Sequence, residues 1–247
     1  DPNLQNIPIR TEKGREIRKA FVPRNEEFLF LSADYSQIEL RIIAHMSGDH
    51  NMQEAFRKGL DIHAATAAKV FNVDIAQVTR EQRSRAKAVN FGIAYGQGAF
   101  GLAQNLGIPR GEAKAIIDDY FSQFPGVRNY MDEMIGFCRT NGYIKTLMGR
   151  RRYLPDITSG NNTVRAQAER IAINAPMQGT AADIIKVAMV DIHRELELRA
   201  MRSRLLLQVH DELVFDTHVD ELEPLKEMVR ARMQGAMELA VPLVVDM

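Results

Sequence analysis

Residues 205–216 read LLLQVHDELVFD, two apolar runs separated by the polar triplet HDE at 210–212. Short apolar runs on both sides of a polar turn predict a β-hairpin. A third run, FLFLSA at 28–33, has the length of a strand and is followed at once by Asp34. Strands near both ends of the chain therefore stop at carboxylates.

Helical patterns fill the segment between these strands. From Gln37 apolar residues recur near one stripe, and helix follows helix over about residues 50–142. The stretch YIKTLMGRRRYLP at 143–155 predicts a short second hairpin. Residues 162–199 predict a long helix that Pro176 and Gly179 should kink or break.

The two ends of the chain complete the pattern. Residues 1–24 predict an extended arm with short strands, 220–239 an amphipathic helix, and VPLVVDM at 241–247 a last strand. Strands at both ends with helices between them predict an α+β protein. Its sheet would be built by the two ends of the chain, and a helical lobe would be inserted between them.

The composition bounds the functions that the chain can have. With 247 residues, 45% of them hydrophobic, it is long enough to bury a core and is not a disordered chain. Its 32 basic and 32 acidic residues cancel, which argues against binding nucleic acid through bulk positive charge. No apolar run is long enough to span a bilayer, and the one cysteine, Cys138, fits a reducing cytoplasm. Because the sequence opens on Asp1 rather than Met, we expect an excerpt of a longer chain.

Asp34 and Asp211, with Glu212, form the first candidate site. Carboxylates at the ends of apolar strands are costly unless they are solvated, paired or bound to metal. As turn residues they would need no further role. Held together on a rigid sheet, however, they would supply the oxygen ligands that hard divalent ions prefer. Two magnesium ions about 4 Å apart can activate one oxygen and stabilise another in phosphoryl transfer.

The stretch RSRAKAVNFGIAY at 83–95 is the second candidate site. On a helical wheel with Arg83 at zero, Lys87, Phe91 and Tyr95 follow at roughly 40°, 80° and 120°. The apolar stripe lies elsewhere, at roughly 240° to 300°, and consists of Ala86, Val89 and Ile93. A helix buried on two sides would show the same pattern. A row of cations and rings also fits a nucleoside triphosphate, and the chain has no GxxxxGK[ST] phosphate loop as an alternative.

Two further features leave alternatives open. Arg170, Asn174 and Gln178 are spaced i, i+4, i+8 on a helix otherwise rich in apolar residues. They could donate to minor-groove acceptors, which differ little between base pairs, or satisfy backbone groups near a break at Pro176. His63 follows Asp61 near a helix start, where a lone histidine is usually structural, and the sequence has no HExxH.

Three ordered motifs in these segments resemble motifs A, B and C of the family A DNA polymerases. They are DYSQIELR at 34–41, RSRAKAVNFGIAYG at 83–96 and QVHDE at 208–212. Four more stretches resemble the same family: LQNIPIR at 4–10, DIHAATA at 61–67, RRRYLPDI at 150–157 and INAPMQGTAADIIK at 173–186. The resemblance covers essentially the whole chain.

The resemblance implies an antiparallel palm sheet flanked by helices, with an inserted, mostly helical fingers subdomain. The palm would comprise residues 1–47 and 161–247, and the fingers residues 48–160. The thumb and exonuclease regions of the family would precede Asp1.

The resemblance also implies roles for individual residues. Asp34 and Asp211 would bind two Mg²⁺ ions, which Mn²⁺ can replace, assisted by the backbone of Tyr35 and, less importantly, by Glu212. Glu39 would exclude ribonucleotides as a steric gate, and Lys87 would act in catalysis by neutralising the leaving pyrophosphate. The nucleotide-binding set would be Arg10, Gln37, Glu39, His63, Arg83, Lys87, Phe91 and Tyr95. Primer–template contacts would come from Arg170, Asn174, Gln178 and His210.

The activity implied is template-directed attack of a primer 3′-OH on the α-phosphate of a deoxynucleoside triphosphate, in bacterial DNA replication and repair. Its partners would be primer–template DNA and deoxynucleoside triphosphates, without a membrane, and the enzyme would be a cytoplasmic monomer. Two alternatives stay open. One is a truncated, non-catalytic primer–template-binding module of the same fold. The other is a single-subunit RNA polymerase, against which Glu39 and Phe91 favour DNA.

Overall fold

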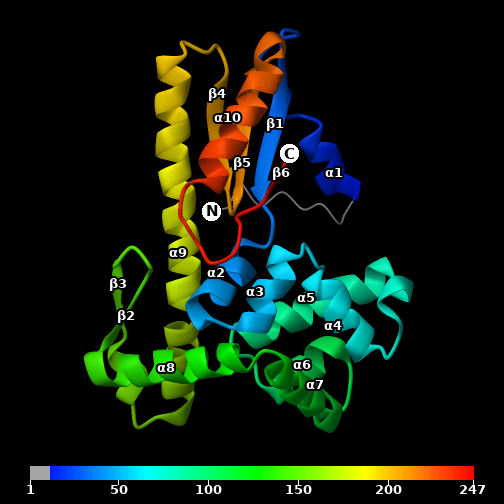
Figure 1. The fold of residues 1–247 in the computed structure, drawn as a ribbon, viewed down its shortest axis with the longest axis vertical. Helices are drawn as coiled ribbons and strands as arrows, with labels where there is room; N and C mark the ends of the chain where they lie inside the picture. The colour runs from blue at the N-terminus through cyan, green and yellow to red at the C-terminus, as the bar shows by residue number, and fades with distance from the viewer. Residues whose placement is uncertain (1–11) are drawn as a thin grey trace. The chain divides into compact units, whose positions relative to one another are not determined.

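The computed structural model describes residues 12–247, apart from the side chain of Arg18 (Figure 1). Within them the chain forms two compact units. The sheet unit comprises residues 12–36, 184–237 and 243–247, and the helical unit comprises 37–183 and 238–242. The predicted α+β class is confirmed. The predicted subdomain borders after residues 47 and 160 stay predictions.

The sheet unit is built on four strands in the order β4–β5–β1–β6, of which β1 pairs antiparallel with both neighbours. These strands are β1 (Phe28–Tyr35), β4 (Arg204–Val209), β5 (Glu212–His218) and β6 (Val245–Asp246). The predicted hairpin is therefore confirmed as β4 and β5, and it pairs with the first predicted strand. Alternation along β1 buries Leu31, Ala33 and Tyr35 and exposes the residues between them, because successive side chains point to opposite faces.

The helices of the sheet unit differ in extent from those that the sequence predicts. Helix α10 (Leu222–Gln234), after the short 3₁₀ turn η3 (Val219–Glu221), packs against β1 and β5 but ends before Gly235, well short of residue 239. The last predicted strand shrinks to the two residues of β6. In the described part of the predicted extended arm, residues 12–18 form a helix, α1 (Glu12–Arg18), because most of its residues are good helix formers.

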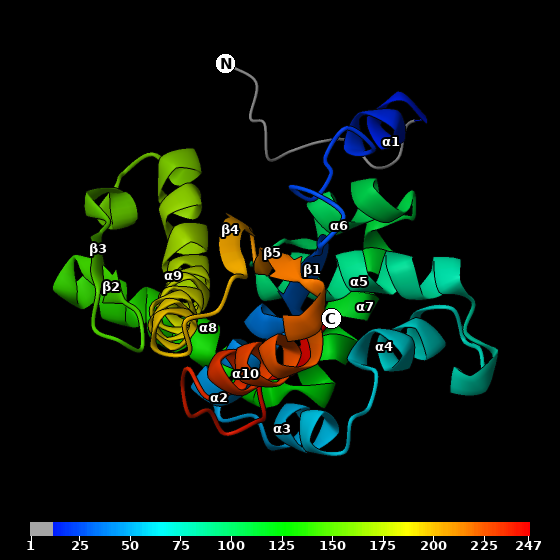
Figure 2. The same ribbon diagram turned by 90° about the horizontal axis from the view of Figure 1, so that it is seen from above.

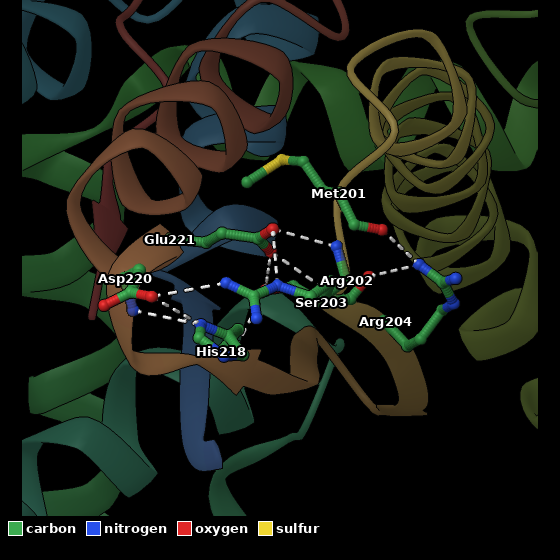
Figure 3. A network of polar contacts seen from close by, with 7 residues as sticks. All are labelled: Met201, Arg202, Ser203, Arg204, His218, Asp220 and Glu221. Atoms are coloured by element: carbon green, nitrogen blue, oxygen red, sulfur yellow. Dashed lines mark hydrogen bonds and ion pairs between the residues drawn. The ribbon is translucent and has the colours of Figure 1, made fainter. Parts of the chain in front are cut away.

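A polar network fixes the β4–β5 hairpin at the end opposite its turn (Figure 3). The Glu221 carboxylate accepts hydrogen bonds from the backbone N–H groups of Arg202 and Ser203, both at 2.9 Å, and from the Ser203 hydroxyl at 2.6 Å. The Ser203 hydroxyl in turn accepts from the backbone N–H of His218 at 3.0 Å. Burial opposes ionisation of Glu221, but these donors outweigh it and lower the pKa of its carboxyl. The network ties the start of β4 to the end of β5, and the pairing register shifts between Leu205 and Leu207 before the strands reach the turn.

The helical unit consists of a series of helices and one short hairpin, as predicted. The helices are α2 (Ile38–Ser47), α3 (His50–Arg57), α4 (Ile62–Val70), α5 (Arg80–Ala94), α6 (Ala99–Leu106), α7 (Arg110–Gln123) and α8 (Pro125–Asn141), with the 3₁₀ turns η1 (Ile75–Gln77) and η2 (Pro155–Thr158). The hairpin is β2 (Tyr143–Lys145) and β3 (Arg151–Tyr153). Helices α4 and α5 pack side by side, which Figure 1 and Figure 2 both show.

Helix α9 (Asn162–Leu198) runs through Pro176 and Gly179 as one helix, so the predicted break is wrong, while a kink there stays a prediction. Proline lacks the N–H that would donate to the carbonyl of Ala172, so the helix continues with one backbone hydrogen bond missing. The turns before Pro176 are held by a core in which Ala168 and Ala172 pack with Cys138 and Ile144. Tertiary packing thus overrides the local preference. Across residues 12–247, every helix is too short or too polar to cross a bilayer.

Candidate functional site

Asp34 and Asp211 lie at the same end of the sheet. Asp34 is opposite Glu212 in the pairing of β1 with β5, and the backbone N–H of Tyr35 donates to the carbonyl of Asp211 at 3.2 Å. Neighbouring strands are about 4.8 Å apart, so the two aspartates lie close together where the paired strands β1 and β5 meet the turn. Asp34 is exposed, while Asp211 and Glu212 are half-buried. The carboxylates predicted from opposite ends of the sequence are therefore brought together.

The carboxylates of Asp34, Asp211 and Glu212 could bind a metal ion only through oxygen atoms. Oxygen ligands suit a hard cation such as Mg²⁺. Glu212 also accepts a hydrogen bond from the Ser32 hydroxyl, which holds its side chain toward β1. In residues 12–247 no group of three or more His, Cys, Asp or Glu is placed to hold a metal ion.

Two other residues predicted for this region have different surroundings. The Tyr35 side chain is buried, its hydroxyl donates to the carbonyl of Met233 at 2.6 Å, and burial raises its pKa. Tyr35 can thus offer only its backbone to the carboxylate edge. His210 is exposed in the turn between β4 and β5, with φ at +57°, and its carbonyl accepts from the Gln208 amide at 2.8 Å.

The second candidate site is built on α5 in the helical unit. The helix begins with a capping box formed by Thr79 and Gln82, and its predicted core stripe is buried. On its other face lie the predicted cations and rings. The Phe91 and Tyr95 ring centroids are 5.8 Å apart, and the Lys87 ammonium lies 5.8 Å from the Phe91 centroid. Lys87 is exposed, so this face is not buried along its whole length.

Arg83 and His63 meet at the N-terminus of α4. Asp61 caps that helix by accepting from the backbone N–H groups of His63 and Ala64 at 3.0 and 3.1 Å, and it pairs with the Arg83 guanidinium. His63 itself is buried, with its ring 5.9 Å from that of Phe91. Burial, together with the nearby positive charges of Arg83 and Lys87, lowers the pKa of His63 to about 4. His63 is therefore neutral at neutral pH.

The C-terminal end of α5 is fixed by hydrogen bonds and by close packing. The Tyr95 hydroxyl donates to the Glu39 carboxylate, and the Asn174 amide donates to the Tyr95 carbonyl at 3.3 Å. Gly96 follows with φ at +74°, and a Cβ there would lie 3.2 Å from a methyl of Ile173. Glycine is needed at this position both for its backbone conformation and for space. The predicted steric gate, Glu39, is thus in contact with the predicted ring, Tyr95.

The three predicted DNA contacts on α9 line one groove, of about 220 Å³. Its lining comprises Arg152, Gln167, Arg170, Ile171, Asn174, Ala175 and Gln178. Arg170 and Gln178 are exposed. Arg152, from the second hairpin, adds a further cationic hydrogen-bond donor to these three, which the spacing on one helix could not predict.

Gln37 and Arg10 complete the predicted set. Gln37 caps α2 in a left-handed conformation, with φ at 55°, and its buried side-chain oxygen has no hydrogen-bond partner in the described part of the chain. Arg10 lies outside the described residues.

Sequence reasoning missed Asn90 and Thr66, two buried polar residues that contact His63 or each other. On the helical wheel Asn90 falls at roughly 340°, next to the apolar stripe. A polar residue at a core position was the available signal. Thr66 gave none, because threonine is common on half-buried helix faces.

The chain belongs to the DNA polymerase family A, whose family model matches all of residues 1–247. The resemblance of its motifs is thereby confirmed. Among curated relatives it is similar to DNA polymerase I of Geobacillus stearothermophilus, with 55% identity over 246 residues, and to that of Lactococcus lactis subsp. lactis (strain IL1403), with 53% over 247. Each match covers 100% of this chain and 28% of the relative, so the chain spans little more than a quarter of their length.

A solved structure agrees. The POL domain of Pol1 from M. smegmatis, in complex with DNA primer–template and dNTP, is 51% identical and superimposes with a TM-score of 0.94. The match covers 99% of this chain and 43% of that one.

Proposed function

We propose that this chain is the palm and fingers portion of a DNA-directed DNA polymerase. Residues 1–47 and 161–247 would be the palm, and 48–160 the fingers. The reaction is attack of a primer 3′-OH on the α-phosphate of a deoxynucleoside triphosphate, with release of pyrophosphate. The observation that carries the proposal is the pairing of β1 with β5, which sets Asp34 opposite Glu212 and next to Asp211 where the two strands end.

Asp34 and Asp211 would hold two Mg²⁺ ions, or Mn²⁺ in their place, with the Tyr35 carbonyl and Glu212 assisting. When bound, these ions supply Lewis-acid activation of the primer hydroxyl and charge stabilisation on the phosphates. The contribution of the protein is to hold both carboxylates on one rigid element before substrate arrives. Paired strands hold the carboxylates in place better than a loop would, because backbone hydrogen bonds fix the positions of the strands.

The face of α5 would bind the incoming triphosphate. Arg83 and Lys87 would neutralise its charge, and neutral His63 would donate to a phosphate oxygen through its ring N–H. The contact of Tyr95 with Glu39 would hold the gate carboxylate where a ribose 2′-OH would need to fit. Arg10 and Gln37 would complete the nucleotide site.

Primer–template DNA would lie against the groove of Arg170, Asn174 and Gln178, with His210 at the primer end. Side-chain donors suit the minor groove, whose acceptors are similar for all base pairs. We further propose that the enzyme acts as a monomer in the bacterial cytoplasm. The complex of the similar M. smegmatis protein with primer–template and dNTP supports these partners.

The deciding experiment is primer extension with and without Mg²⁺, using deoxy- and ribonucleotides in parallel. It should be run on this chain and on the complete polymerase proposed to contain it. Extension that requires Mg²⁺ and strongly prefers deoxynucleotides is expected of the complete enzyme. Primer–template binding without extension by that enzyme would instead favour the non-catalytic module, and a preference for ribonucleotides would favour an RNA polymerase.

A further inference from the structure

A chain of buried polar groups links α4 to α5 behind His63. The Thr66 hydroxyl donates to the Asn90 side-chain oxygen at 2.9 Å, and the Asn90 amide nitrogen lies 2.9 Å from Nδ1 of His63. All three residues are buried: Asn90 is 0% exposed, His63 1% and Thr66 8%. A buried polar group is costly unless it is paired. The hydrogen bonds that join Thr66, Asn90 and His63 therefore favour the arrangement of protons in which each donor faces an acceptor.

The carbonyl of Ile62 sets the direction of this chain. It lies 3.5 Å from the Asn90 amide nitrogen, and a carbonyl oxygen can only accept. If the amide were turned over, its oxygen would face the Ile62 carbonyl and two acceptors would oppose each other. The amide N–H₂ therefore points to Nδ1 of His63, which must accept. Because a neutral imidazole carries one proton, that proton is on Nε2.

Nε2 of His63 is buried and has no hydrogen-bond partner among the described residues. An N–H donor left unpaired in the interior costs free energy, which binding of an acceptor would recover. The charged groups near the ring are Arg83 and Lys87, which oppose its protonation, and Asp61, which pairs with Arg83 and favours it. The ring thus presents one fixed, neutral donor near the exposed ammonium of Lys87, which favours an anionic acceptor.

We propose that Asn90 and Thr66 are positioning residues that hold His63 as the Nε2–H tautomer, so that it donates to a phosphate oxygen of the incoming nucleotide. This inference rests on the proposed function of α5 as the triphosphate-binding helix. Thr66 orients the Asn90 amide, and Asn90 fixes the ring. Neither residue touches the nucleotide.

The tautomer is tested directly by ¹⁵N NMR of the complete polymerase with labelled histidines, in which the His63 signals are those lost in His63→Gln. A protonated Nε2 and an unprotonated Nδ1 are expected in the wild type. In Asn90→Asp the carboxylate can only accept, so Nδ1 should become protonated. A protonated Nδ1 in the wild type, or an unchanged ring in Asn90→Asp, overturns the proposal whether or not the protein extends primers.

Single-nucleotide incorporation tests the consequence for binding. Asn90→Leu should raise the KM for dNTP about tenfold with kcat changed far less. The hydrogen bond from His63 to the charged phosphate, which this variant would weaken, is present both in the bound substrate and in the transition state. Thr66→Val should have a smaller effect in the same direction, and Thr66→Ser, which keeps the hydroxyl, should stay close to wild type. Equal effects of Val and Ser at residue 66 would contradict the proposal.

A double-mutant cycle separates positioning from general damage to the fold. If Asn90 acts through His63, Asn90→Leu should add almost nothing to the KM effect of His63→Ala. Additive effects mean that Asn90 acts by another route and overturn the inference. All variants are compared at temperatures below the unfolding transition of the least stable one. If the wild type failed to extend primers, the proposed function would fail, while titration with inorganic tripolyphosphate would still report whether the His63 ring signals move.

Discussion

The two candidate sites achieve their geometry in different ways. At the end of the sheet, the pairing of β1 with β5 puts Asp34 beside the β4–β5 turn, where Asp34 is exposed and Asp211 and Glu212 are half-buried. At α5, side chains hold one another: Asp61 pairs with Arg83, and Tyr95 with Glu39. Under the proposed function, a substrate at α5 would have to compete with these side-chain partners, whereas metal ions at the end of the sheet would bind at positions that strand pairing sets. Substitutions at the edge should therefore affect the chemical step, and those at α5 the binding and selection of nucleotide.

The largest effect is expected from the aspartates at the sheet edge. Asp34→Ala or Asp211→Ala in the complete polymerase should lower the rate of primer extension by about 10³-fold or more, because metal-assisted charge stabilisation is worth several kcal/mol. Rapid-quench kinetics with saturating dNTP would measure it. Glu223→Ala, which removes an exposed carboxylate of α10, is the control and should be near wild type. DNA affinity of both aspartate variants should change little, and retained extension would refute the metal assignment.

The next effect concerns the choice of sugar. Glu39→Ala removes the carboxylate held by Tyr95, so discrimination against ribonucleotides should fall by roughly 10- to 100-fold with little loss of dNTP incorporation. The ratio of kcat/KM for dNTP and rNTP is the measurement. Tyr95→Phe, which deletes only the hydroxyl, should lower the ratio less than Glu39→Ala does. An unchanged ratio in Glu39→Ala would mean that the sugar is selected elsewhere.

A smaller effect is expected on stability at acid pH. The pKa of His63 is lowered to about 4 in the folded protein, against an ordinary value near 6.5. Its neutral form therefore favours folding fully above the ordinary value, and this stability is lost as the pH falls from about 6.5 toward 4. Urea unfolding at pH 7 and pH 5 should show a loss of stability that is reduced in His63→Gln. Equal pH dependence in the two proteins would show that other groups dominate.

The smallest effect is expected from the pair of Asp61 with Arg83. Burial opposes ionisation of Asp61, but the hydrogen bond from Arg83 and the backbone N–H of Ala64 outweigh it and lower the pKa of its carboxyl. Asp61→Asn keeps a good helix cap but removes the competing charge, so the KM for dNTP should fall by about two- to fivefold. Arg83→Ala should raise the same KM. A rise in KM for Asp61→Asn would mean that the pair orients Arg83 for the triphosphate rather than competing with it.

The parts of the fold that the sequence predicts well are those with a strong local pattern. Two apolar runs around His210 and Asp211 could hardly form anything but a hairpin, and the wheel of α5 separated its buried stripe from its cations and rings. Pro176 misled because the local rule ignores packing, and the alanines of α9 against α8 keep the helix intact. The early end of α10 at Gln234 likewise depends on how the following residues pack, which periodicity does not reveal.

The same division applies to the candidate site. Residues in contiguous motifs, such as Arg83 and Lys87, could be assigned together. The pairing of Tyr95 with Glu39, and of Asn90 with His63, joins segments far apart in sequence and required coordinates. The net charge of zero was also a poor guide to nucleic-acid binding. The proposed contacts in the groove on α9 depend on where the hydrogen-bond donors lie and not on the total charge of the chain.

The buried link from Thr66 through Asn90 to His63 has an evolutionary consequence. Each group requires the donor or acceptor pattern of the next, and a change at one position leaves an orphaned group that costs about 1–3 kcal/mol. The residues at these three positions should therefore be substituted together in evolution rather than one at a time. In an alignment of polymerases, sequences without a hydroxyl at the position of Thr66 should therefore also depart from Asn at the position of Asn90, and the two sites would be inherited as one unit.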